Sequence, residues 1–119
     1  MEDLDHDALV EDLRDPDPRK RQLALMQLED IAGEESVTPL LAALEDPDAV
    51  VRRLAVGLLE ELGDPRAVPG IIRRLVDSDP AVKDAASAAL RDFRGEAAAT
   101  ALLEAMTHPD AEEIGRAHV

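Results

Sequence analysis

The sequence predicts an all-α fold, an α-α superhelix (solenoid) of about three helical-hairpin repeats with a half repeat at each end. Two observations predict it. A set of residues recurs every 31 residues, as from Asp15 to Asp46 and from Asp46 to Asp77. Within each unit, the apolar residues follow the i, i+3, i+4 spacing of a buried helical stripe. The composition agrees, because 45% of the residues are hydrophobic but only Phe93 is aromatic, which favours a core of Leu, Val, Ile and Ala.

We expect residues 1–119 to form one domain, because this length is too short for two ordinary domains. The repeat divides this domain into units. Three acidic turns align without a gap: Asp15-Pro16-Asp17, Asp46-Pro47-Asp48 and Asp77-Ser78-Asp79. The predicted units are an N-terminal half repeat at 5–14, repeats at 15–45, 46–76 and 77–107, and a C-terminal partial helix at 108–119.

Each repeat is expected to begin with a first helix. Its predicted N-cap is the last aspartate of the turn, and prolines at positions 18 and 80 suit the first helical position, where a missing N–H costs nothing. In the second repeat, residues 51, 54, 55, 58, 59 and 62 form the predicted buried stripe. We expect Gly33, Gly63 and Gly95 to end these helices in the left-handed conformation.

A second helix is expected in each repeat, at 37–45, 66–76 and 96–106. Prolines 39 and 69 predict that its first turn tightens or bends. The segment 5–14 matches only this second helix and is predicted to cap the stack. At the other end, 108–119 restarts a first helix without its mate, so we expect a frayed end or pairing with a second chain: a monomer, or a weak dimer through the C-terminal end.

Charge narrows the classes of partner. The formal net charge of −14 opposes binding to nucleic acid and to anionic membrane surfaces. The basic residues are eleven arginines and two lysines, which fits either a salt-rich cytoplasm or a GC-rich genome. Without cysteines, an apolar signal-peptide core or a long apolar run, we expect a cytoplasmic protein.

The second repeat, "DPDAVVRRLAVGLLEELGDPRAVPGIIRRLV", resembles a HEAT-like repeat of the short type named after phycobilisome lyases. The matching features are the Asp-Pro-Asp turn, the Val51-Arg52 pair, the small Ala55 and the Gly-Asp-Pro at 63–65, and the resemblance covers residues 5–117. It implies a curved stack whose second helices line a concave surface that binds other proteins. Some members of this family assist bilin attachment, and others carry di-iron hydroxylase chemistry.

The residues give little support for catalysis, a metal or a cofactor. The di-iron relatives use His-Glu dipeptides, and this chain has none. We interpret His6 as a solvated residue of the N-terminal cap. No histidine occupies a repeat row that matches a serine, so a serine nucleophile is rejected. The sequence therefore predicts a non-catalytic protein-interaction module, and the alternative is a bilin-lyase-type enzyme or accessory subunit.

The predicted binding surface is the groove along the second helices. Two of its rows are Glu11, Ala42, Arg73, Glu104 and Asp12, Ala43, Arg74, Ala105. We predict that Arg73 and Arg74, with Glu11 and Glu104 beside them, anchor a protein or peptide partner, because paired arginines bind carboxylates or stack on aromatic rings. An inter-repeat salt bridge from Arg73 to Glu104 or Glu11 stays open as the alternative.

Arginine also recurs near the start of the first helix. Arg21, Arg52 and Lys83 align, which predicts a periodic structural bond to an aspartate of an adjacent turn. Arg53 does not recur as a base, so we expect it to be free to contact a partner from the outer face.

Overall fold

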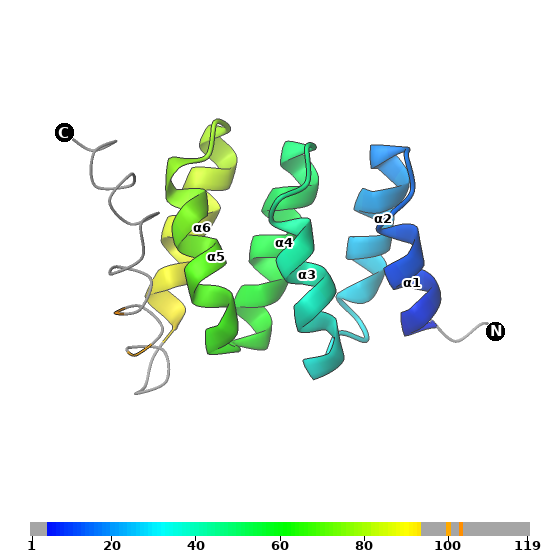
Figure 1. Ribbon diagram of the computed structural model, residues 1–119, viewed down its shortest axis with the longest axis horizontal. Helices are drawn as coiled ribbons and strands as arrows, with labels where there is room; N and C mark the ends of the chain where they lie inside the picture. Colours follow the sequence, from blue (N-terminus) through cyan, green and yellow to red (C-terminus); the bar gives the residue numbers. More distant parts are fainter. Residues whose placement is uncertain (1–4, 94–99, 101–102, 104–119) are drawn as a thin grey trace.

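A computed structural model describes residues 5–93 together with Thr100 and Leu103. Helices and turns make up this described part, and it contains no strand. The helices pair and stack side by side in two layers, with α1, α3 and α5 in one layer and α2, α4 and α6 in the other (Figure 1). The architecture is thus an all-α stack of helical hairpins, as the repeat predicts. Of the expected second helix of the third repeat, only Thr100 and Leu103 are described, and the C-terminal partial helix lies outside the described residues.

The described part contains α-helices and short 3-10 segments (η). In order they are α1 (His6–Asp12), α2 (Pro18–Leu28), η1 (Glu34–Ser36), α3 (Val37–Ala43), α4 (Ala49–Leu62), η2 (Pro65–Ala67), α5 (Val68–Arg73), η3 (Arg74–Val76) and α6 (Pro80–Asp92). The tight 3-10 turns η1 and η2 come directly before α3 and α5, whereas Pro39 and Pro69, where tightening was expected, lie inside these two α-helices. None of the helices described is both long and apolar enough to traverse a lipid bilayer.

The aspartates expected to begin the first helices do so. Asp17 accepts a hydrogen bond from the backbone N–H of Arg19 at 2.9 Å, and Asp48 accepts one from Val51 at 3.0 Å. Asp79 caps α6 in the same way. These carboxylates satisfy N–H groups that have no partner inside the helix, so the acidic turns both separate the repeats and start their helices.

The glycine prediction is correct at Gly63 and wrong at Gly33. Gly63 ends α4 in the left-handed region with φ of 66°, whereas Gly33 has an extended backbone with φ of −149° and precedes η1. The 31-residue register explains the difference, because Gly33 aligns with Asp64, the N-cap of η2, and not with Gly63. The helix before Gly33 ends earlier, at Leu28. Gly95 lies outside the described residues.

The core lies between the two layers. Its fully buried side chains are aliphatic, and α4 contributes to it at the centre of the stack, between α2 and α6. The largest are Leu25, Leu28, Leu40, Leu44, Leu59 and Ile71. Leu9 of α1 is also buried in this core.

Candidate protein-binding surface

A ladder of arginines and aspartates runs along the edge of the stack where the acidic turns lie. Arg52 donates from Nε and Nη2 to the two carboxylate oxygens of Asp77, both at 2.9 Å, in a bidentate pair. Its Nη1 also donates to the backbone carbonyls of Asp46 and Pro47. One guanidinium therefore joins its own turn to the turn of the next repeat, as the periodic column predicts.

The same contact occurs one repeat earlier. Arg21 donates to the Asp15 carbonyl at 2.7 Å and to the Asp46 carboxylate at 3.0 Å. Lys83 occupies the third position of this column and is exposed. Because the contact recurs, we assign these arginines a structural role in joining adjacent repeats, and not a role as an anion-binding site.

Asp77 is the most enclosed carboxylate of the ladder, with 2% of its side chain exposed. Burial raises the pKa of Asp77. The hydrogen bonds from Arg52 and from the backbone N–H of Asp79, with the charges of Arg52 and Arg74, outweigh it, so the pKa lies below its usual value. Asp77 is therefore a carboxylate at neutral pH and holds both arginines.

Arg73 and Arg74, the predicted anchors, lie at the C-terminal end of the second helix of repeat two and differ in exposure. Arg74 is 17% exposed, and it contacts Asp77 at 3.1 Å and Glu45 at 3.6 Å. Arg73 is 43% exposed and makes a longer contact of 3.8 Å with Glu45. Arg74 is thus part of the ladder, whereas Arg73 reaches into solvent.

Glu45, which the sequence rows did not predict, is a partner of both arginines. It follows α3 in the preceding repeat, one residue before the acidic turn. Arg73 does not pair with Glu11, the partner predicted from the described part of the chain, and Glu104 lies outside that part. Glu45 lies three residues, about one helical turn, after Ala42, which the register aligns with Arg73, and this nearness was the available signal.

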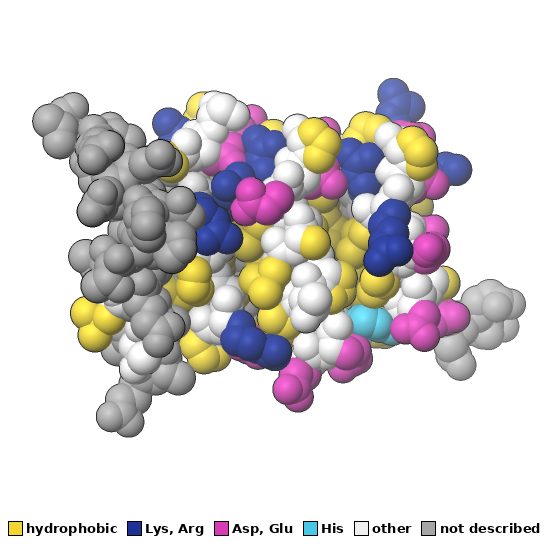
Figure 2. All heavy atoms as spheres, in the orientation of Figure 1, with side chains coloured by type: hydrophobic (Ala, Val, Ile, Leu, Met, Phe, Trp, Pro, Cys, Tyr) yellow, Lys and Arg dark blue, Asp and Glu magenta, His cyan; other side chains and the backbone are white. Residues whose placement is uncertain are grey.

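A hollow lies on the face formed by the second helices, between α1 and α3. Its volume is about 390 Å³. The lining residues are Val10, Leu13, Arg14, Thr38, Pro39, Ala42, Ala43 and Asp46. Figure 2 shows this face, with apolar side chains along its middle and charged ones around them. Ala42 and Glu11 of one row are exposed, whereas Ala43 of the other row is 7% exposed and packs toward the core, although Asp12 of that row is exposed.

Comparison with known families decides what kind of repeat this is. The family model for HEAT repeats matches the chain twice, over residues 6–69 and 37–118. The chain belongs to the HEAT-repeat family. The two matches overlap and together span most of its length, so the repeat found by alignment of the sequence with itself is a HEAT repeat.

A solved structure similar to this HEAT-repeat chain is the complex of CpcE and CpcF of phycocyanin lyase from Nostoc sp. PCC7120. The TM-score is 0.71 and the sequence identity 29%. The match covers 90% of the present chain and 44% of the chain in that structure, so the HEAT repeats described here span less than half of that protein. No curated protein matches the sequence.

One side-chain pair in this HEAT-repeat chain has the appearance of a catalytic dyad. His6 Nε2 lies 2.7 Å from Ser36 Oγ, which corrects the expectation that His6 is solvated and shows a contact that the repeat rows could not predict. Ser36 is fully buried, and its Oγ also accepts a hydrogen bond from the backbone N–H of Gly33. The pair joins α1 to η1, and the Ser36 hydroxyl is closed to solvent.

Proposed function

We propose that this HEAT-repeat chain is a non-catalytic scaffold module that binds a protein or peptide on its second-helix face. The observation that carries the proposal is the hollow between α1 and α3, because its small and apolar lining leaves room for the side chains of a partner. The similarity to CpcE and CpcF supports it, since that structure is a complex of two proteins.

Within this face, Arg73 is the better anchor of the two predicted arginines. Its contact with Glu45 is long, and both side chains are about half exposed, so a carboxylate or an aromatic ring of a partner can replace Glu45 at small cost. Glu11, exposed on α1 in the same row, supplies an acidic contact. We include Glu104 in the proposed binding surface because the sequence places it in the same row as Arg73.

A second candidate function is a bilin-lyase-type subunit. The specific observation that favours it is the 29% identity with the phycocyanin lyase complex. A shift in the absorption spectrum of a free bilin on mixing with the pure protein would favour this function. An unchanged spectrum would favour the scaffold function.

The test of the scaffold function starts with capture of the partner from the native cytoplasm at its native salt, followed by identification. Affinity is then measured for Arg73→Ala and for Ala42→Arg, which places a large side chain in the hollow. Each change should weaken binding about tenfold or more, as at interface hot spots. Arg19→Ala removes an exposed arginine at the start of α2 and is the matched control. Equal affinities for the wild type and all three variants would contradict the proposal.

A further inference from the structure

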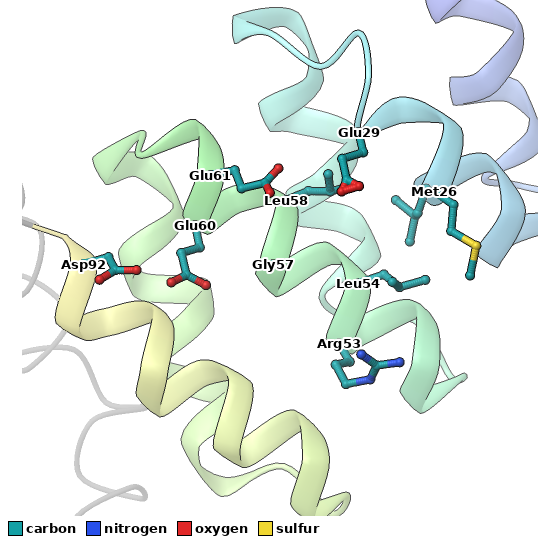
Figure 3. Close-up of a pocket in the computed structure, with 10 residues that line it drawn as sticks. Met26, Glu29, Arg53, Leu54, Gly57, Leu58, Glu60, Glu61 and Asp92 are labelled. Carbon is teal, nitrogen blue, oxygen red and sulfur yellow. The ribbon is translucent and has the colours of Figure 1, made fainter.

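A second groove lies on the opposite layer, formed by the first helices. It runs between α2 and α4 and reaches the last residue of α6, with a volume of about 460 Å³ (Figure 3). Met26, Leu54 and Leu58 give it apolar walls, and 53% of Met26 is exposed. We call it the first-helix groove. An apolar groove of this size has room for side chains of another molecule.

Gly57 lies at the middle of this groove (Figure 3). Glycine destabilises the interior of a helix relative to alanine, and α4 is 14 residues long with Gly57 near its centre. A Cβ built on Gly57 meets no atom within 4 Å, so packing inside the described protein does not require its absence. Close approach of an external molecule to the helix backbone does account for a glycine here.

The charge of the groove is concentrated at one end. Glu29, Glu60, Glu61 and Asp92 line that end, where α2, α4 and α6 terminate and their helix dipoles are also negative. Neither α2 nor α4 has a basic residue in its last turn to offset this charge. Arg53 lies at the other end, about 12 Å from Glu61 along the helix axis.

The crowding of these carboxylates is unfavourable in the free protein. A hydrogen bond with Asp92, burial and the negative charges of Asp92 and Glu61 raise the pKa of Glu60 above its usual value. A cationic side chain placed among them offsets the repulsion. The same four carboxylates repel phosphates and so disfavour nucleic acid and anionic lipid, and the net charge of −14 disfavours a second copy of this chain.

We propose that the first-helix groove binds an amphipathic helical segment of a partner protein, whose apolar side chains cover Met26, Leu54 and Gly57 and whose lysine or arginine side chains contact Glu60, Glu61 and Asp92. The length of the groove matches about two turns of helix. This site is separate from the second-helix face, so the two layers of the stack hold different partners at once.

The test uses the full chain and synthetic helical peptides of about 14 residues with leucine at i, i+3, i+4 and i+7. One peptide carries lysines beside the leucines and the other glutamates. Fluorescence anisotropy at about 0.15 M salt measures their affinities. We expect the lysine peptide to bind and the glutamate peptide not to bind.

Two pairs of variants then locate the binding. Gly57→Leu fills the groove and should weaken binding at least about tenfold while it raises Tm, because leucine favours the helix and its side chain meets open space. Ala88→Leu adds the same side chain to an exposed position of α6 and should leave the affinity unchanged. The double variant Glu60→Gln with Glu61→Gln should weaken binding more than Glu34→Gln with Glu35→Gln, which removes the same charge elsewhere.

Three results would overturn the proposal. The first is equal loss of affinity in the two glutamine pairs, which indicates attraction to the overall charge. The second is unchanged affinity in Gly57→Leu. The third is a dimer in sedimentation that Gly57→Leu abolishes, which identifies a second copy of the chain as the occupant of the groove.

Discussion

At the scale of single residues, the arginine and aspartate ladder depends on groups that are charged and almost fully enclosed. Asp77 accepts two hydrogen bonds from Arg52 and one from Arg74, and it caps its own turn through the N–H of Asp79. Removal of this carboxylate leaves two guanidinium groups without their main partner. Buried pairs of this kind are sensitive to loss of one member, even where the intact pair adds little to stability.

We expect Asp77→Asn to lower the free energy of unfolding by about 3 kcal/mol at pH 7, because the buried Arg52 loses its counter-charge. Urea unfolding measures the change. Glu34→Gln is the control, since Glu34 and its partner Arg66 are 88% and 52% exposed and 4.0 Å apart. It should change stability by less than about 0.5 kcal/mol. Equal losses in the two variants would contradict the role of burial.

The stabilisation of the folded protein by Asp77 should depend on pH. The pKa of Asp77 is lower in the folded than in the unfolded protein, so its stabilisation is present above the ordinary aspartate pKa of 3.8 and is lost as pH falls through the folded pKa. The wild type should therefore approach the Asp77→Asn variant in stability as the pH is lowered below 3.8. A stability difference that stays constant from pH 7 to strong acid would show that charge is not the cause.

The contribution of Glu60 to stability should depend on pH in the opposite direction. Its pKa is raised in the folded protein, so its contribution is most favourable below the unfolded pKa and is lost as pH rises through the folded pKa. We expect Glu60→Gln to raise Tm at pH 7 by the equivalent of a few tenths of a kcal/mol, through relief of repulsion from Asp92 and Glu61. Thermal melts at pH 7 and pH 4 test this, and a Tm gain that is larger at pH 4 would contradict it.

At the scale of elements, two glycines that look alike in the sequence should respond differently to alanine. Gly63→Ala should cost about 1 kcal/mol, because Gly63 has φ of 66° and an L-residue is strained there. Gly33→Ala should cost less, since its backbone is extended and the new Cβ would meet only the flexible end of Glu35, at 3.3 Å. Denaturant unfolding of both variants measures the difference, and equal costs would contradict the assignment of the two backbones.

The helices could be predicted because each carries its own start signal and apolar spacing, and the 31-residue register repeats them. Gly33 was misassigned because it was compared with Gly63 by residue type, while the register places it with Asp64. Such an offset of one residue changes which helix end a glycine serves. The error concerns one boundary and leaves the order of elements intact.

The candidate site was less predictable for a physical reason. Adjacent residues on a helix point about 100° apart, so the sequence rows could not tell that Ala42 is exposed while Ala43 is buried. The row also could not show which repeat supplies the partner of a long arginine side chain. Arg73 contacts Glu45 of the adjacent repeat in place of Glu11, which lies two repeats away. The periodic Arg52 contact was predictable because its partner recurs with it.

At the scale of the whole molecule, the net charge of −14 acts on every repeat. Added KCl screens repulsion among exposed carboxylates far more than it weakens the enclosed contact between Arg52 and Asp77. We therefore expect Tm to rise with KCl, as followed by circular dichroism. Loss of the fold at low salt would favour the salt-rich cytoplasm over the GC-rich genome as the origin of the composition, and a Tm that falls with KCl would contradict the prediction.

The ladder has a consequence for how such a chain can change in length. The 31 residues from Asp46 to Val76 contain Arg52, which donates to an aspartate of the next repeat. They also contain the Asp46 carboxylate, which accepts from Arg21 of the preceding repeat. A tandem copy of this unit would meet its original with the same donor and acceptor that join the natural neighbours. Duplication of this stretch of coding sequence can therefore add a repeat without the invention of a new interface, and deletion can remove one in the same way.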